Sequence, residues 1–194
     1  MMPGIVIKNI SEIATPTPGV KRGKELSNLS ITHGMSIYIK DGIINEIGNF
    51  GTFKESIDGN SQIIDGMGKT VVPGFIDSHT HLVFAGTREN EFGKRIRGAT
   101  YREIADSGGG IKKTVSDTRN ASKDELVENA SIYLDNALQN GTTTMEVKTG
   151  YGLDIETELK MLDVIDELNK NQPVELIPTF LGAHAIPGSI SKSD

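Results

Sequence analysis

The hydrophobic pattern of the chain changes at about Thr70, and this change constrains the fold more than any other feature. Before it, short apolar runs are separated by glycine and proline and show no helical periodicity, as in a small β-rich domain. After it, segments with strand character alternate with segments of helical periodicity, which predicts βαβ units and a parallel sheet. We therefore expect an α/β protein with two domains, residues 1–70 and residues 71–194.

The first domain contains one strong local signal. The alternating segments 36–40 and 43–48 flank Asp41-Gly42. This pair predicts a β-hairpin, because the favoured two-residue turn needs positive φ at both central positions. We place a loop at residues 14–19 and a turn around His33, and we interpret the domain as a small β-sandwich.

The second domain contains two predicted helices. Ser122 and Glu125 have the spacing of a capping box, and Asp154 is the expected N-cap of the next helix. Strands are expected at residues 142–147 and 173–181. The residues predicted to face inward are Leu126, Val127, Ala130, Leu134, Ala137 and Leu138 in one helix and Leu159, Leu162, Ile165 and Leu168 in the other.

A further hydrophobic strand, residues 70–77, leads directly into His79 and His81. Alternate side chains of a strand share a face, so the two imidazoles are expected to point the same way. Such a pair can bind one divalent ion of the zinc or iron type, and Asp77 is a candidate for orienting it. A lone pair of this kind is more often a surface or core feature, so spacing alone leaves both interpretations open.

The candidate polar residues collect after the carboxyl ends of predicted strands. His79 and His81, residues 150–152 and residues 182–184 all have this position, which is where barrel enzymes place their chemistry. Gly108–Gly110 lacks the spacing of a dinucleotide-binding motif. We therefore expect a (β/α)8 TIM-type barrel. Such a barrel needs about 250 residues, so in a chain of 194 residues it is incomplete and the chain is expected to be the N-terminal part of a longer protein.

Composition excludes several classes of function. A net charge of −6 gives no reason to expect nucleic acid or an anionic membrane as partner. The absence of cysteine excludes disulfides and thiolate metal ligands. No apolar run approaches the roughly 18 residues of a membrane span, and no signal peptide is visible, so a cytoplasmic location is expected. The basic residues 94–97 are expected to form a solvated helix face or loop.

Several longer motifs resemble those of the imidazolonepropionases, a family of the amidohydrolase superfamily. Residues 65–81 resemble the entry into the first barrel strand, which many deaminases and cyclic-amide hydrolases share. The resemblance is continuous from about Asp65 to Pro187, whereas the first sixty residues match mainly in layout. The segments that resemble this family more narrowly are 84–92, 98–101, 108–111, 146–153 and 179–187.

This resemblance implies hydrolysis of the ring C–N bond of 4-imidazolone-5-propanoate by metal-activated water, giving N-formimidoyl-L-glutamate in histidine breakdown. It implies one zinc or iron ion bound by His79 and His81, with a further His and Asp beyond Asp194. The 194-residue chain alone is therefore expected to be inactive. A full-length protein of this family is expected to form a homodimer.

The resemblance also implies roles for four other side chains. Arg88 would bind the propionate carboxylate, Tyr151 and His184 would contact the substrate, His184 would act in catalysis, and Tyr101 would contribute less. The competing interpretations are an ion pair of Arg88 with Glu89 or Glu91, a turn aromatic for Tyr151 and a buried structural histidine for His184. Lys148 is expected to be an ion-paired lysine rather than a metal-bridging one.

Two other functions stay open. Another amidohydrolase, such as a nucleobase deaminase or a dihydropyrimidinase-like enzyme, would share the strand with His79 and His81. Arg88 distinguishes these, because a nucleobase carries no carboxylate to pair with it. A non-catalytic half-barrel that acts through a partner is the alternative from a different class.

Overall fold

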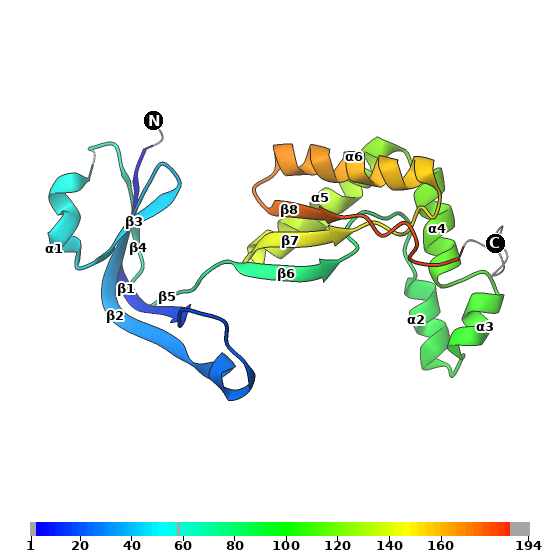
Figure 1. The fold of residues 1–194 in the computed structure, drawn as a ribbon, viewed down its shortest axis with the longest axis horizontal. Coiled ribbons are helices and arrows are strands. Elements are labelled where there is room, and N and C mark those ends of the chain that lie inside the picture. Colours follow the sequence, from blue (N-terminus) through cyan, green and yellow to red (C-terminus); the bar gives the residue numbers. More distant parts are fainter. Residues whose placement is uncertain (1–2, 58, 187–194) are drawn as a thin grey trace. The chain divides into compact units, whose positions relative to one another are not determined.

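The computed structural model describes residues 3–57 and 59–186, and the chain divides into two compact units, Met1–Pro73 and Gly74–Asp194 (Figure 1). The first unit contains strands and short helical turns, and the second contains strands and longer helices. Within the described residues, no helix is long and apolar enough to cross a membrane.

The first unit is built around one five-stranded mixed sheet. The order is β3-β2-β1-β4, and β5 also pairs with β1. The two hairpin pairings are antiparallel, whereas β4 and β5 run parallel to β1. The elements are β1 (Ile5–Pro16), η1 (Gly23–Ser27), β2 (Leu29–Lys40), β3 (Ile43–Gly48), α1 (Phe50–Phe53), η2 (Lys54–Ser56), β4 (Gln62–Asp65) and β5 (Thr70–Val71).

The predicted hairpin is confirmed, with φ of 50° at Asp41 and 78° at Gly42. The loop expected at residues 14–19 is partly wrong, because β1 continues through Pro16. The turn expected around His33 is wrong, since His33 lies in β2 opposite Glu12. A long antiparallel ladder satisfies the backbone of both segments and outweighs the local proline and glycine signals. The described residues form one sheet here, and a sandwich would need a second sheet packed on it.

The second unit contains a three-stranded parallel sheet in the order β6-β7-β8. The strands stand in the sheet in the same order as in the chain. The predicted strand at residues 142–147 is confirmed as β7, and that at 173–181 is shorter than expected. The elements are β6 (Phe75–Thr80), α2 (Glu89–Ile96), α3 (Tyr101–Asp106), α4 (Ile111–Asn120), α5 (Lys123–Gln139), β7 (Thr142–Lys148), α6 (Ile155–Asn171) and β8 (Glu175–Thr179).

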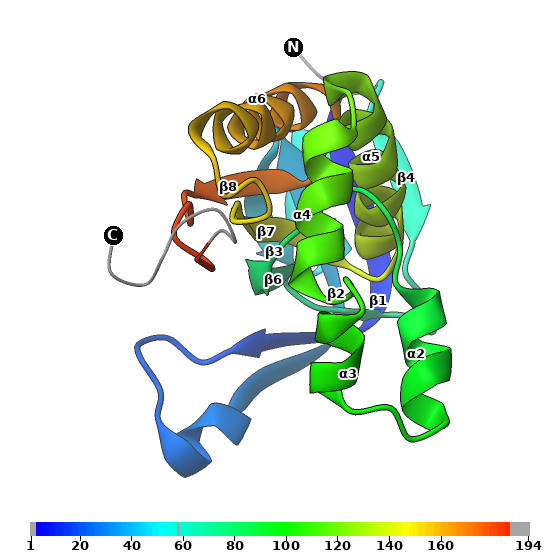
Figure 2. The same cartoon turned by 90° about the vertical axis from the view of Figure 1, so that its right-hand side faces the viewer.

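Helices α5 and α6 cover one side of this sheet (Figure 2). Met145 and Val147 alternate along β7 and are buried in the same core as both helices. The intervening residues of β7, Glu146 and Lys148, belong to the other face of the sheet. Both helices begin as predicted: Ser122 and Glu125 form a capping box, and Asp154 accepts the backbone N–H of Thr157.

The inward faces of the two helices differ from the prediction to different degrees. In α5, Leu126, Ala130 and Leu134 are buried as expected, and Val127 and Ala137 are partly buried. The prediction for Leu138 is wrong, since 37% of its surface is exposed near the end of the helix. In α6, the prediction for Leu159 is wrong: its side chain is 53% exposed, and the adjacent Glu158 is 2% exposed. The physical reason is the phase of the helix: Glu158 lies one turn before the buried Met161 and two turns before the buried Ile165, and its carboxylate finds hydrogen-bond donors in the preceding loop. The parallel strands β6, β7 and β8 all end at the same edge of their sheet, and the candidate site lies at that edge.

Candidate functional site

His79 and His81 lie at the carboxyl end of β6, on and just after its last residues. Their ring centroids are 5.9 Å apart, with an angle of 63° between the ring planes. His79 is exposed and His81 is half-buried. The carboxylate of Asp77 accepts the backbone N–H of His79 at 3.2 Å, so it orients the backbone of this pair rather than an imidazole.

Tyr151 and His184 reach the same place from the ends of the next two strands. The His81 ring lies 4.8 Å from the Tyr151 ring, at an interplanar angle of 29°, and 4.8 Å from the His184 ring. The Tyr151 and His184 rings are 5.9 Å apart. The three strand ends thus bring His79, His81, Tyr151 and His184 into one cluster, although these residues are widely separated in the sequence.

The electrostatic surroundings of His81 favour its neutral form. Burial, followed by the proximity of His184 and then of His79, lowers the pKa of His81, while a hydrogen bond to the backbone of Thr149 raises it. The Nδ1 atom of His81 is buried without a hydrogen-bond partner in the described structure. A buried nitrogen left unpaired is unfavourable, and a neutral imidazole is the form that binds metal ions. The histidine pair therefore fits a divalent ion.

The pair does not complete a metal site by itself. Among the residues that the structure describes, no group of three or more His, Cys, Asp or Glu side chains could hold a metal ion. Structural zinc sites have four protein ligands and catalytic ones have three, so further ligands are needed beside His79 and His81.

The loop that carries Tyr151 depends on the glycines on either side of it. Gly150 has φ of 111°, and a Cβ there would lie 2.7 Å from the Cβ of His184. A Cβ at Gly152 would lie 2.7 Å from the backbone nitrogen of Glu158. Thr149 is fully buried, and its hydroxyl accepts the N–H of Leu181 at 2.9 Å. The Tyr151 loop and the loop before His184 are therefore held together.

A cavity of about 330 Å³ lies beside His81, and Arg88 lines it together with Tyr151. The Arg88 side chain is 48% exposed, and its Nε lies 3.9 Å from the Glu91 carboxylate. The ion pair with Glu91 that the sequence suggested is therefore present, at the outer limit of such contacts. It does not remove the guanidinium from the cavity. The cavity is lined by His81, Phe84, Gly86, Thr87, Arg88, Glu89, Thr114, Tyr133 and Tyr151.

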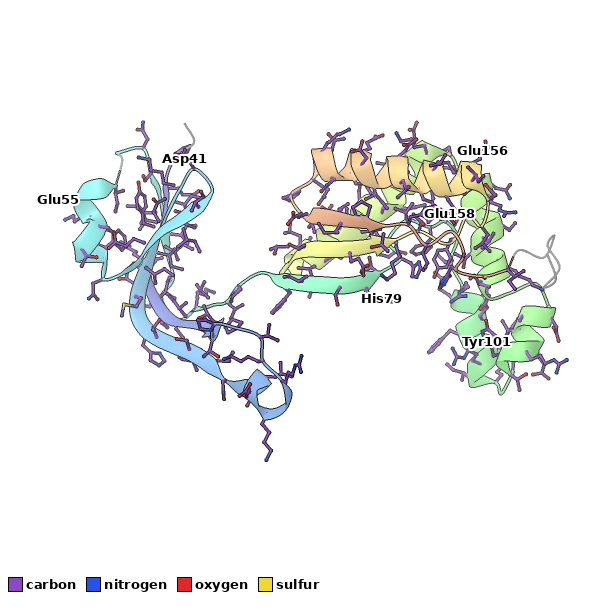
Figure 3. All side chains as sticks on the ribbon, viewed as in Figure 1. Asp41, Glu55, His79, Tyr101, Glu156 and Glu158 are labelled. Carbon is purple, nitrogen blue, oxygen red and sulfur yellow. The ribbon has the colours of Figure 1, made fainter. Side chains whose placement is uncertain are left out.

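Tyr101 does not join this group. It lies on α3 with 71% of its surface exposed, and it is absent from the lining of the cavity. Figure 3 labels both residues and shows Tyr101 far from His79. The basic residues 94–97 are exposed at the end of α2, as a solvated helix face.

Lys148 is ion-paired, as the sequence suggested. Its Nζ contacts the carboxylate of Glu146, which also accepts the hydroxyl of Thr179 at 2.7 Å. These hydrogen bonds, first from Lys148 and then from Thr179, lower the pKa of Glu146. At the carboxyl ends of the strands, the face opposite the helices thus carries paired polar side chains, whereas Ile76 and Ile177 on the same face are exposed.

Sequence reasoning missed Thr149, which joins two loops, and Glu158, which binds the Tyr151 loop. A carboxylate at an inward helical position four residues after an N-cap was the available signal for Glu158. Nothing local marks Thr149.

A larger hollow of about 660 Å³, lined by Asp117, Glu125 and Glu128 among others, contains none of the histidines and lies outside the site.

No protein-family model matches the chain. Curated relatives do match it over nearly its whole length. The imidazolonepropionase of Alkaliphilus metalliredigens is 47% identical over 191 residues, covering 96% of this chain and 45% of the relative. That of Clostridium tetani is 44% identical, covering 94% and 44%. A probable imidazolonepropionase of Dictyostelium discoideum is 43% identical, covering 97% and 46%. The chain thus spans less than half the length of these relatives.

Solved structures share the fold at lower sequence identity. Guanine deaminase of E. coli has a TM-score of 0.64 and 20% identity, covering 91% of this chain and 37% of that one. A triazine hydrolase from Arthrobacter aurescens has a TM-score of 0.63 and 16% identity, covering 92% and 36%. An atrazine chlorohydrolase from Arthrobacter aurescens TC1, complexed with zinc, has a TM-score of 0.51 and 16% identity, covering 91% and 35%. These likenesses show that the chain shares its fold with part of each of these enzymes.

Proposed function

The chain is a relative of the imidazolonepropionases, and from this premise we propose that the protein, at its relatives' length, opens the ring of 4-imidazolone-5-propanoate. Water would cleave the ring C–N bond and give N-formimidoyl-L-glutamate. The observation that carries this proposal is the cavity that Arg88 lines together with His81 and Tyr151. It combines a site for an anionic group with the edge of a candidate metal site.

His79 and His81 would hold one divalent ion, zinc or iron, because both metals accept imidazole nitrogen. The unpaired Nδ1 and the lowered pKa of His81 support this assignment. When bound, such an ion supplies Lewis acidity, which polarises the ring carbonyl and makes water a stronger acid. Further ligands would come from outside the described residues.

Arg88 would bind the propionate carboxylate of the substrate. A guanidinium donates two parallel N–H bonds to a carboxylate, a geometry that lysine cannot reproduce. The distance of 3.9 Å to Glu91 leaves room for a better-placed anion to compete. This residue argues against a nucleobase deaminase, since a nucleobase has no carboxylate.

His184 and Tyr151 would contact the reacting ring. The His184 ring, 4.8 Å from His81, would donate a hydrogen bond to the negative charge that develops on the carbonyl oxygen. Tyr151 would pack against the planar substrate, because it already stacks on His81. A role for Tyr101 would require α3 to bring it to the cavity.

We also propose an incomplete (β/α)8 barrel for the second unit. The sequential order of its parallel strands, β6-β7-β8, is that of a barrel and equally that of one half of a doubly wound sheet, and the resemblance to the imidazolonepropionases favours the barrel. We also propose that residues 1–70 belong to a small β-sandwich whose second sheet would come from outside the described residues, with the barrel beginning at residue 71. A cytoplasmic location and a homodimer at full length belong to the same proposal.

The test is turnover by the product of the complete gene, loaded with zinc or iron, with 4-imidazolone-5-propanoate and with guanine. Arg88→Gln should lower kcat/KM for the imidazolone about 10- to 100-fold, since hydrogen bonds to charged groups contribute about 1.5–3 kcal/mol. Arg95→Gln, at an exposed position of the same helix region, is the control. If the protein converted guanine but not the imidazolone, the proposal would be overturned and a deaminase would be favoured.

A further inference from the structure

Glu158 is a buried carboxylate that the proposed reaction does not use directly. It lies in the first turn of α6 with 2% of its surface exposed. Its two oxygens accept three backbone N–H groups, from Gly150 at 3.0 Å, Gly152 at 2.8 Å and Leu153 at 2.9 Å. A buried charged residue is rare and is normally paired. Here the loop backbone takes the place of a counter-ion.

These three N–H groups belong to the loop that carries Tyr151, and the loop has an unusual backbone. Gly150 has φ of 111°, and Leu153 has φ of 54°, a conformation that non-glycine residues rarely adopt. Such a loop keeps its shape only if its surroundings hold it. Glu158 binds both residues and the glycine that follows Tyr151.

The carbonyl side of the same loop is held separately. Arg119 donates from Nε to the carbonyl of Gly152 at 2.7 Å and pairs with Asp154 at 2.8 Å. Lys160 donates to the carbonyls of Thr118, Arg119 and Ala121, at 3.1, 3.1 and 2.7 Å, and so fixes the end of α4 that carries Arg119. The loop is therefore bound through its N–H groups by α6 and through a carbonyl by α4.

We propose that Glu158 is a positioning residue for the proposed hydrolysis, because it holds the loop that places the Tyr151 ring 4.8 Å from His81. This inference rests on the proposed function. Figure 3 labels Glu158 and also Glu156, which lies two residues earlier on the same helix and is exposed. Glu158 is the carboxylate that meets the loop, and Glu156 is its natural control.

The carboxylate is chemically specific in this role. A carboxylate only accepts hydrogen bonds, so both of its oxygens can face N–H groups. Glutamine has the same shape but places an NH₂ group where one oxygen stood, directly against an N–H donor. Glu158→Gln therefore disturbs the loop and leaves the volume of the side chain unchanged.

The experiment compares Glu158→Gln with Glu156→Gln in the metal-loaded product of the complete gene. We expect Glu158→Gln to lower kcat/KM roughly 10- to 100-fold, the size of effect produced by displacing a substrate-positioning group by about 1 Å. Hydrogen exchange should become faster in the peptide that contains residues 150–153. Glu156→Gln should change neither quantity, and equal values for the two variants would overturn the inference.

A double-mutant cycle separates positioning from a general loss of structure. If Glu158 acts through Tyr151, Glu158→Gln should cost little further activity in a Tyr151→Ala background. Full additivity would contradict the inference. Should Glu158→Gln not fold, Arg119→Gln tests the other side of the loop at a half-exposed position. Arg119→Gln should also make hydrogen exchange at residues 150–153 faster. An unchanged exchange rate would contradict the proposal that these contacts hold the loop.

The exchange measurement also distinguishes the two proposals. If the wild-type protein shows no hydrolysis of the imidazolone but Glu158→Gln still accelerates exchange at residues 150–153, the proposed function fails and a structural clamp remains. If the wild-type protein is active and neither exchange nor kcat/KM responds to Glu158→Gln, the positioning role fails alone.

Discussion

Helices α5 and α6 resemble each other in most respects, yet they bury different kinds of side chain. Each has 17 residues, begins with a side-chain cap and packs against the core that contains β7. The buried positions of α5 are all apolar. Those of α6 include Thr157 and Glu158 at its start and become apolar only from Met161 onward. One helix covers the sheet, while the other covers the sheet and also holds a loop of the site.

The difference shows how burial is decided. Along α5 and the later turns of α6, transfer of apolar surface from water determines which face points inward. The same helical phase continues into the first turn of α6, where the inward side chain is the carboxylate of Glu158, and this carboxylate accepts three N–H groups of the neighbouring loop. Hydrogen bonds therefore offset the cost of burying this side chain, whereas the adjacent leucine lies off the buried face.

The largest effect on stability is expected from the apolar core common to both helices. Leu134→Ala in α5 and Leu168→Ala in α6 each remove a buried side chain, and each should lower the free energy of unfolding by about 2–5 kcal/mol. Urea titration of the complete gene product measures this. Below the unfolding transition kcat/KM should stay near the wild-type value, and a selective loss of activity in Leu134→Ala would break the comparison.

A smaller loss of stability and a larger loss of activity are expected from Glu158→Leu. An apolar side chain of similar size leaves the loop N–H groups without an acceptor, at about 1–3 kcal/mol. The same urea titration gives the stability, and steady-state kinetics give the activity. An increase in stability would mean that burial alone determines the inward face of α6.

The two N-cap residues form a matched pair of variants, and their expected effect on stability is of intermediate size. Ser122→Ala and Asp154→Ala each remove an oxygen that accepts a helix N–H, and each should cost about 1 kcal/mol. Asp154 also pairs with Arg119, so only Asp154→Ala should reduce kcat/KM. Thermal unfolding and kinetics of both variants test this, and equal activities would place the Asp154 pair outside the support of the loop.

The smallest effect is expected at Leu159, the residue that hydropathy alone would bury. Its side chain is 53% exposed, so Leu159→Ala should change the free energy of unfolding by no more than about 0.5 kcal/mol. A loss in the range of the Leu134→Ala variant would show that α6 is turned by one position relative to the structure.

The features that the sequence predicts correctly are those with a local cause. The Asp41-Gly42 hairpin, the capping box at Ser122 and the cap at Asp154 all follow from residues within a few positions of one another. The meeting of His81, Tyr151 and His184 follows from parallel strands, whose carboxyl ends share one edge.

The features that sequence reasoning did not identify depend on distant partners. His33 extends a strand because Glu12 lies opposite it, and the buried carboxylate of Glu158 finds its hydrogen-bond donors in a loop. The exposure of Tyr101 follows from the way α3 packs, which no local pattern reports.

Strand β6 carries both candidate metal ligands, and within the described residues its neighbour in the sheet is β7 on one side only. A side-chain hydrogen bond also joins β6 to β7: the Thr80 hydroxyl donates to the carbonyl of Glu146 at 2.6 Å. The opposite edge of β6 presents backbone donors and acceptors to whatever pairs there. A strand paired along that edge would hold β6 from its second side, and with it the backbone that carries His79 and His81.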